Sequence, residues 1–262
     1  MSRHADIENE IETLITYMQR VGNAEGTIKQ RVGRLRALGV PPSEATPHDV
    51  AASLPASARK STRRVYLAAL NAAFRDLVTL GICTTNPTLP IHVPNAGRGE
   101  PRPLSQAVVD ALLSAPPCPE RDWTILGIYA GFRASDVVAA YAEDLVETDH
   151  GLAVQVEGKG EKRALLPAHP KVVEVFTGKR TRGPLWRMQA ASMSSRWSAW
   201  AKTRTGLTLR YHQCRHTFGT RVYRSTQDIL VTRDLMRHNS VATTQIYAKA
   251  NDDAGFRAVV GL

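Results

Sequence analysis

Helical spacing of apolar positions dominates the first third of the chain. In IENEIETLITYMQR, residues 7–20, apolar residues recur at 7, 11, 14, 15 and 18, which is the spacing of one helical face. Further helices are predicted over 27–39, with Thr27 as N-cap and Gly39 as the stop, after Pro47, and over 57–81, ended by Gly81. Residues 5–83 are therefore expected to be all helical.

The helical pattern stops after this region. Residues 86–103 contain five prolines and two glycines among few apolar residues, a composition typical of an extended linker. We place the linker at 91–102, so that it separates a helical domain, residues 1–90, from a second domain, residues 103–262.

The second domain mixes helices with one small sheet. Over 151–168, apolar and polar residues alternate on both sides of GKGEK, which predicts an antiparallel hairpin. Helices are expected over 104–115 with Ser105 as cap, 122–132 broken at Gly131, 133–145 capped by Ser135, 171–176, 192–204, 211–225, 228–238 and 241–250. The predicted fold class is mainly α: a small all-helical N-terminal domain followed by an α+β domain with a small antiparallel sheet.

Composition indicates a globular protein of a reducing compartment. The chain has 262 residues, of which 43% are hydrophobic. The charged N-terminus has no signal-peptide pattern, and the longest uncharged apolar run, WTILGIYAGF, is about half the length that a bilayer needs. Three widely spaced cysteines, Cys83, Cys118 and Cys214, argue against a disulfide framework. We expect a cytoplasmic, nucleoid-associated protein of a bacterium or a phage-infected cell, without a membrane partner.

The net charge of +10 is concentrated in one segment. Residues 175–227 contain no Asp or Glu, but eleven Lys or Arg. A second basic cluster, RKSTRR, occupies 59–64. A solvated surface built only for solubility would intersperse both signs, so this distribution favours a polyanion, and nucleic acid above all.

The stretch TLRYHQCRHTFGT, residues 208–220, holds the densest cluster of functional side chains. His212 and His216 lie four apart and share a helical face, with Cys214 between them. A metal site is disfavoured, because Cys214 points away from the pair and no second Cys or His pair follows at finger spacing. Two interpretations of this stretch remain: it binds nucleic acid, or it forms part of an active site.

Four other polar groups of the second domain have ordinary explanations when taken singly. Arg133 could be a surface residue before a helix, and Lys159 could decorate the hairpin turn. His238 could interact with the dipole at a helix end, and Tyr247 could be a half-buried core tyrosine. Their combination with His212 and Arg215 carries the functional signal.

Together these positions resemble the motifs of the tyrosine site-specific recombinases, which include phage integrases and the recombinases that resolve chromosome dimers. The motifs are an Arg in a G-F-R-x-S-D stretch, a Lys in a G-K-G turn, H-x-x-R, a His, and a Tyr nine residues after it. They fall on Arg133, Lys159, His212 with Arg215, His238 and Tyr247. The resemblance extends over both domains and implies that the helical domain is a core-binding domain, which with the catalytic domain forms a clamp around DNA.

Two departures from the family pattern stand out. Arg237 precedes His238 where the family usually has Gly, which could alter local packing or add a phosphate contact. Cys214 stands where Leu is common and keeps a small apolar character. The chain also starts almost directly with the core-binding helices, so we expect the arm-binding domain of some phage integrases to be missing.

The resemblance implies a role for each residue of the motifs. Tyr247 would attack the scissile phosphorus and form a 3′-phosphotyrosine, while Arg133 and Arg215 would bind the phosphate oxygens. His212 would assist as base, Lys159 would protonate the leaving 5′-oxygen with Lys162 as a stand-in, and His238 would donate a hydrogen bond. With two fixed cations in place, no metal or other cofactor is expected. His216 is expected to have a structural role inside its helix.

Partners follow from the same resemblance. They are double-stranded DNA with an inverted-repeat core site, a homotetramer on that DNA and an excision or directionality factor. Base-reading or phosphate-binding candidates are Lys60, Arg63, Arg64, Ser194, Arg196 and Lys202. The apolar segment 252–262 is expected to dock on a neighbouring subunit.

The favoured biological role is a phage or mobile-element integrase. The alternative is a recombinase that resolves chromosome or plasmid dimers. A non-catalytic DNA-binding protein and a type IB topoisomerase are further alternatives, disfavoured because all six catalytic positions are filled and because the chain is small with two domains.

Overall fold

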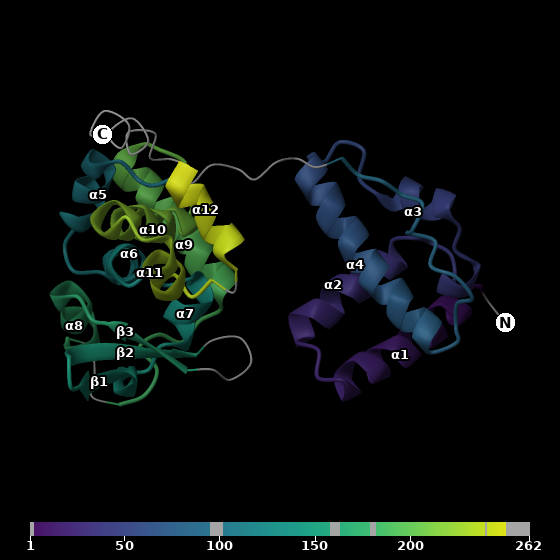
Figure 1. Ribbon diagram of the computed structural model, residues 1–262, viewed down its shortest axis with the longest axis horizontal. Helices are drawn as coiled ribbons and strands as arrows, with labels where there is room; N and C mark the ends of the chain where they lie inside the picture. Colours follow the sequence, from purple (N-terminus) through teal and green to yellow (C-terminus); the bar gives the residue numbers. More distant parts are fainter. Residues whose placement is uncertain (1–2, 95–101, 158–162, 179–181, 239, 250–262) are drawn as a thin grey trace, which may run out of the picture. The chain divides into compact units, whose positions relative to one another are not determined.

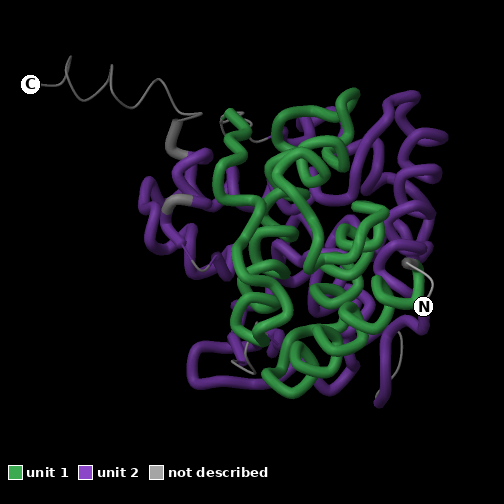
Figure 2. Tube along the Cα trace, turned by 90° about the vertical axis from the view of Figure 1, so that its right-hand side faces the viewer, with its two compact units in different colours: residues 1–97 green, residues 98–262 purple. Residues whose placement is uncertain are grey.

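A computed structural model describes residues 3–94, 102–157, 163–178, 182–238 and 240–249. The chain divides into two compact units, residues 1–97 and 98–262 (Figure 1; Figure 2), and each unit has its own hydrophobic core. The division falls inside the predicted linker, of which residues 95–101 lie outside the described residues. Within the described ranges, no helix is both long and apolar enough to cross a bilayer.

Unit 1 has only helices and the turns and loops that join them among its described residues. Its elements are α1 (Arg3–Arg20), α2 (Glu25–Arg36), the 3₁₀ turn η1 (Pro42–Glu44), α3 (Pro47–Ser53) and α4 (Lys60–Thr79). The apolar face predicted for α1 is buried, with Ile11, Leu14 and Met18 inaccessible to solvent. The ion pair between Arg31 and Asp76, 2.6 Å long, joins α2 to α4.

The predicted Thr27 cap is wrong. α2 begins two residues earlier, at Glu25, and the N-cap position is occupied by Ala24. Glu25 lies in the first turn, where its charge is favourable against the helix dipole, and pairs with Lys29 one turn later at 2.7 Å.

Unit 2 contains eight α-helices and one sheet among its described residues. The elements are α5 (Gln106–Leu113), α6 (Pro119–Tyr129), α7 (Ala134–Ala139), η2 (Ala142–Asp144), β1 (Leu145–Thr148), β2 (Gly151–Glu157), β3 (Arg163–Pro167), α8 (Pro170–Thr177), α9 (Ala190–Thr205), α10 (His212–Thr226), α11 (Ile229–Leu235) and α12 (Val241–Lys249). The sheet and α8 lie at one end of the unit (Figure 1). Helices α6, α11 and α12 pack against α10, and α9 packs against α5, α6 and α7. The predicted fold class, mainly α with a small antiparallel sheet, is confirmed.

The sheet is larger than the predicted hairpin. Strands β2 and β3 pair antiparallel, with Val154 opposite Leu166, and β1 adds a third strand on the other side of β2. The prediction of a continuous helix over 133–145 is wrong, because α7 ends at Ala139 and the chain then turns into β1. Residues 140–142 instead pair with residues 183–185, through Ala142 N–H to the Gly183 carbonyl and Leu185 N–H to the Ala140 carbonyl.

The N-cap predicted from the sequence is confirmed for α5 and is wrong for α7. The Ser105 hydroxyl accepts from Val108 N–H, as predicted. Ser135, the predicted cap of the next helix, is not its N-cap. The backbone of Arg133 takes that position, and Asp136 accepts the Arg133 N–H at 2.8 Å.

The core of unit 2 holds α10 against α6. Trp123, Trp197 and Cys214 are inaccessible to solvent, and the Tyr211 hydroxyl donates to the Trp123 carbonyl at 3.0 Å. The two helices approach closely at Gly127, because a Cβ added there would lie 2.5 Å from the Cys214 Cβ. This packing fixes the position of the helix that carries His212 and Arg215.

Candidate active site

Helix α10 supplies three of the polar side chains within one and a half turns. His212 is exposed at the first residue of the helix, whereas Arg215, one turn later, is 1% exposed. The Arg215 guanidinium donates through one terminal nitrogen to the Gly131 carbonyl and through the other to the Met236 carbonyl. Arg215 therefore links α10 to two other segments. These are the connection between α6 and α7 and the turn between α11 and α12.

The connection between α6 and α7 presents Arg133. Gly131 has φ +64°, and a Cβ there would lie 2.5 Å from the Phe218 ring, so glycine is required at the break that the sequence predicted. The Arg133 side chain is 39% exposed and donates through Nη2 to the Arg237 carbonyl at 3.1 Å. Of the two predicted phosphate-binding arginines, Arg133 is thus the one with access to solvent.

The turn between α11 and α12 carries His238. Its Nδ1 lies 3.0 Å from the hydroxyl of Thr244, which is buried in α12. The helix predicted over 228–238 is shorter than expected, since α11 ends at Leu235 and Arg237 has a left-handed backbone with φ 50°. His238 consequently lies in the turn, directly after the Arg237 carbonyl that accepts from Arg133.

Helix α12 carries Tyr247, whose side chain is packed over α10. The residue is 3% exposed, and its hydroxyl lies 3.1 Å from His216 Nδ1. Gly219 makes room for the ring, because a Cβ there would lie 2.7 Å from Tyr247 Cζ. Tyr247 thus has a defined resting position.

The electrostatic environment keeps the histidines neutral. Burial, followed by His212 and Arg215, lowers the pKa of His216 to about 4. Burial, followed by Arg215 and Arg133, lowers the pKa of His238 to about 4. The pKa of His212 is lowered by the same causes, partial burial first and then the two arginines. The shared neighbours place Arg133, the start of α10 and His238, which belong to three separate segments, within electrostatic range of one another.

The hydroxyl of Tyr247 and the guanidinium of Arg215 also influence each other. Burial raises the pKa of Tyr247 to about 12, and the positive charge of Arg215 opposes this increase. Burial, together with Arg133 and Arg237, lowers the pKa of Arg215 below its usual range. A buried phenol beside a buried cation needs a partner to take its proton before it can attack.

Some of the predicted site residues fall outside this cluster. Lys159 and Lys162 lie outside the described residues. Lys60 and Lys202 are exposed at the surfaces of α4 and α9. Arg196 is exposed but forms a 2.5 Å ion pair with Glu120, which reduces the charge that it offers to DNA. The other DNA-binding candidates are Arg63 and Arg64 on α4 and Ser194 on α9.

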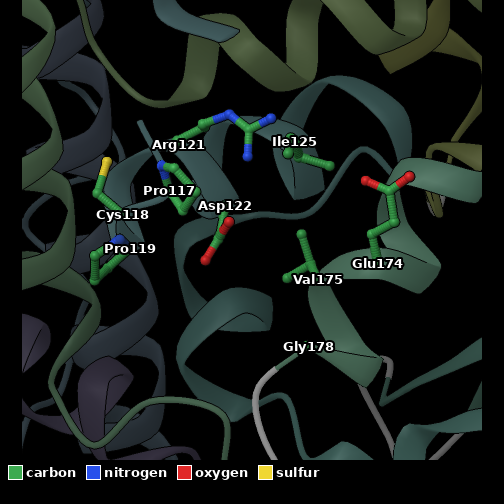
Figure 3. A pocket seen from close by; sticks show the side chains of 9 residues that line it. All are labelled: Pro117, Cys118, Pro119, Arg121, Asp122, Ile125, Glu174, Val175 and Gly178. Carbon is green, nitrogen blue, oxygen red and sulfur yellow. The ribbon is translucent and has the colours of Figure 1, made fainter. Parts of the chain in front are cut away.

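Two further observations bear on what the site can bind. In the part of the chain that the structure describes, no group of three or more His, Cys, Asp or Glu is placed to hold a metal ion. A hollow of about 350 Å³ lies between the start of α6 and α8, where Arg121, Asp122 and Glu174 face it (Figure 3), and none of the candidate catalytic residues lines it.

Sequence reasoning missed the contact of His216 with Tyr247, the role of Asp136 and the partner of Arg237. His216 contacts the Tyr247 hydroxyl, a contact that the expected structural role did not include. Asp136 and Arg237 form an ion pair beside Arg133. The spacing of His212 and His216 on one helical face was the available signal for the first. Nothing local in the sequence predicts the pairing of residues that lie 101 positions apart.

Comparison with known proteins defines the class. Residues 104–254 match the sequence profile described as the Phage integrase family. The chain is 30% identical over 212 residues to tyrosine recombinase XerD from Pseudomonas aeruginosa, an alignment that covers 72% of this chain and 70% of XerD.

Solved structures agree with this match. The integrase from mycobacterium phage Brujita aligns with a TM-score of 0.50 at 26% identity, covering 93% of this chain and 88% of that one. A lambda integrase dimer bound to a COC′ core site aligns with a TM-score of 0.68 at 17% identity, covering 92% and 76%, which shows a shared fold. Lambda integrase bound to a Holliday junction as a tetramer aligns with a TM-score of 0.66.

The fold and these matches define an enzyme that binds DNA and cuts and rejoins its strands. The chain belongs to the phage integrase family and is a tyrosine recombinase.

Proposed function

We propose that this chain is a site-specific recombinase in which Tyr247 attacks the scissile phosphodiester, forming a 3′-phosphotyrosine and releasing a 5′-hydroxyl. The observation that carries the proposal is a chain of contacts. Arg133 and Arg215 donate to the carbonyls of Arg237 and Met236 in the turn that bears His238, and His238 contacts Thr244 of the helix that carries Tyr247. The His212 ring packs against His216, which contacts the Tyr247 hydroxyl. The covalent bond retains the energy needed for rejoining, so neither ATP nor a metal is required by the chemistry.

The two arginines bind the phosphate oxygens on which negative charge accumulates in the transition state. Arg133 is accessible already. Arg215 uses two of its five N–H groups on the carbonyls of Gly131 and Met236, which leaves the others for a phosphate. Because Arg215 is 1% exposed, DNA binding must open the loops that cover it.

Proton transfer involves the neutral imidazoles. The phenol of Tyr247 must lose its proton during attack, and His212 acts as the base, since its lowered pKa keeps it unprotonated at neutral pH. In the resting protein the hydroxyl is bound to His216 instead, so attack begins with release of this contact. His238 donates to the phosphate through the ring nitrogen that does not contact Thr244.

Lys159 is proposed as the acid that protonates the leaving 5′-oxygen. It belongs to the segment that joins β2 to β3, and Lys162 is the stand-in in the same segment. An ammonium group at the leaving 5′-oxygen would complete the set of six groups. Phosphate contacts by the acid-free segment 175–227 would supply most of the affinity for DNA.

The proposed role is integration of a phage or mobile element at an inverted-repeat core site by a DNA-bound homotetramer. The likeness to the Brujita integrase and to the lambda integrase dimer and tetramer on DNA supports this choice. The second candidate is resolution of chromosome or plasmid dimers, and the 30% identity to XerD favours it. An excision factor that sets direction belongs to the first role.

A nicked suicide substrate tests the chemistry. The wild-type chain should form a covalent protein–DNA adduct, Tyr247→Phe should bind the same DNA without forming it, and an adduct in the variant would overturn the proposal. Adduct formation on DNA of any sequence would instead indicate a topoisomerase. Recombination between two different attachment sites marks an integrase, whereas efficient recombination only between identical sites marks a resolving enzyme.

The C-terminal segment 252–262 lies outside the described residues, and its docking on a neighbouring subunit stays a prediction. Deleting it should leave binding to a single half-site intact and weaken synapsis. Unchanged recombination by the truncated chain would refute this role.

A further inference from the structure

Arg237 has a backbone conformation that its side chain makes unfavourable. Its φ is 50°, and Gln227, φ 53°, is the other non-glycine residue with positive φ among those described. A residue with a Cβ is disfavoured in this left-handed region, whereas glycine is not. An arginine retained at such a position points to a contribution from its side chain.

The Arg237 side chain is built into the site. Its Nη2 donates to Asp136 Oδ2, and the two side chains are 8% and 9% exposed. The same Oδ2 accepts the backbone N–H of Arg133 at 2.8 Å, and the Arg237 carbonyl accepts from Arg133 Nη2 at 3.1 Å. A closed ring of hydrogen bonds therefore joins the start of α7 to the turn between α11 and α12, with Arg133 held on both sides.

The Asp136 carboxylate also competes with a phosphate for the Arg133 guanidinium. Its Oδ2 lies 3.9 Å from Arg133 Nη1, close enough for a direct ion pair. A nearly buried carboxylate without another cation would take the guanidinium of Arg133 in a charge-assisted bond. Arg237 already donates to that oxygen, so Arg133 Nη1 stays 3.9 Å from it, beyond hydrogen-bond distance and available to an incoming anion, while Nη2 donates to the Arg237 carbonyl.

We propose that Arg237 is a positioning residue for strand cleavage: it donates to Asp136 and thereby keeps Arg133 Nη1 out of a hydrogen bond with that carboxylate, so that Nη1 can bind the scissile phosphate. This inference rests on the proposed function. Arg237 Nε and Nη1 are buried without hydrogen-bond partners, so its positive charge is only partly compensated. That charge acts on Arg133 and Arg215 alike and favours an anion between them.

The core site is first identified by binding selection from random duplexes. A nicked duplex that carries this site is then used to compare the single-turnover rate of covalent adduct formation between wild type and variants. Arg237→Gly removes the side chain and relieves the backbone. It should cleave about 10- to 100-fold more slowly, while its affinity for the intact duplex changes less than about twofold. The double variant Arg237→Gly, Asp136→Asn removes the competing charge and keeps an acceptor for the Arg133 N–H, so it should recover most of the rate.

Controls separate this role from stability and from the chemistry itself. Gln227→Gly relieves the same kind of backbone conformation away from the site and should cleave at the wild-type rate. If Arg237→Gly does not fold, Arg237→Lys, which keeps a cation beside Asp136, should retain more activity than Arg237→Met. Wild-type cleavage by Arg237→Gly, no recovery in the double variant, or equal rates for the Lys and Met variants would overturn the positioning role. Absence of any adduct with the wild-type chain would overturn the proposed function instead.

Discussion

Replacing Gly127 by alanine tests whether helix packing sets the geometry of the active site. Gly127 lies inside α6, where alanine is favoured over glycine by about 1 kcal/mol on helix propensity alone. Helix propensity alone therefore predicts that the substitution increases the free energy of unfolding. The tertiary structure predicts that it decreases the free energy of unfolding.

The packing of α6 on α10 decides the sign. The added Cβ would lie 2.5 Å from Cys214 Cβ and 3.0 Å from the Tyr211 hydroxyl, whereas ordinary contacts are 3.4–4 Å. Cys214 Cβ is attached directly to the backbone, so relief requires α10 to move by about 1 Å. Such overpacking costs about 1–3 kcal/mol, which outweighs the gain in propensity. Because His212 and Arg215 flank Cys214, the same displacement should slow cleavage by about 100-fold.

Urea unfolding and the suicide-substrate assay measure both effects. Gly33→Ala is the matched control: Gly33 lies inside α2, and nothing lies within 4 Å of its added Cβ. The control should gain up to about 1 kcal/mol in the free energy of unfolding without a change in cleavage rate. A Gly127→Ala variant that is more stable than wild type, or that cleaves at the wild-type rate, would refute the reasoning.

Three further outcomes are expected. Tyr247→Phe should lose about 0.5–1.5 kcal/mol in the free energy of unfolding, because His216 loses its partly buried hydrogen bond; unchanged urea unfolding would contradict the contact. Since His216 and His238 have folded-state pKa values of about 4, below the unfolded value of about 6.5, the unfolded state binds more protons in acid. The contribution of these two neutral histidines to the free energy of unfolding should be fully present above pH 6.5 and fall as the pH decreases to 4. A melting temperature that is constant over this pH range would argue against neutral imidazoles. Affinity for duplex DNA should fall linearly on a log–log plot against salt, and Lys202→Ala should reduce the slope by about 1; an unchanged slope would remove Lys202 from the contacts.

Hydrophobic periodicity predicted the helices of unit 1 well, because a helix that buries one face repeats its apolar residues along the sequence. Ile11, Leu14 and Met18 show this directly, since all three are inaccessible. Errors arose where distant segments compete with local preference. Residues 140–145 have a helical composition, but their backbone groups pair with residues 183–185 and with β2.

The catalytic candidates could be predicted because residue types at characteristic separations along the sequence are enough to identify them. Arg133, His212, Arg215, His238 and Tyr247 could all be named without coordinates. Their surroundings could not: the bond of Tyr247 to His216 and the ring formed by Arg133, Asp136 and Arg237 join residues far apart in the chain.

The sequence by itself determined the helical architecture, the basic segment and the candidates for the reactive groups, because periodicity, charge and motif spacing are local properties. Tertiary structure alone decided which guanidinium is exposed, where the phenol rests and which carboxylate lies beside Arg133. These features depend on how α10 packs against α6, α11 and α12, and the close approach of α6 to α10 at Gly127 is one contact of this packing that no local pattern encodes.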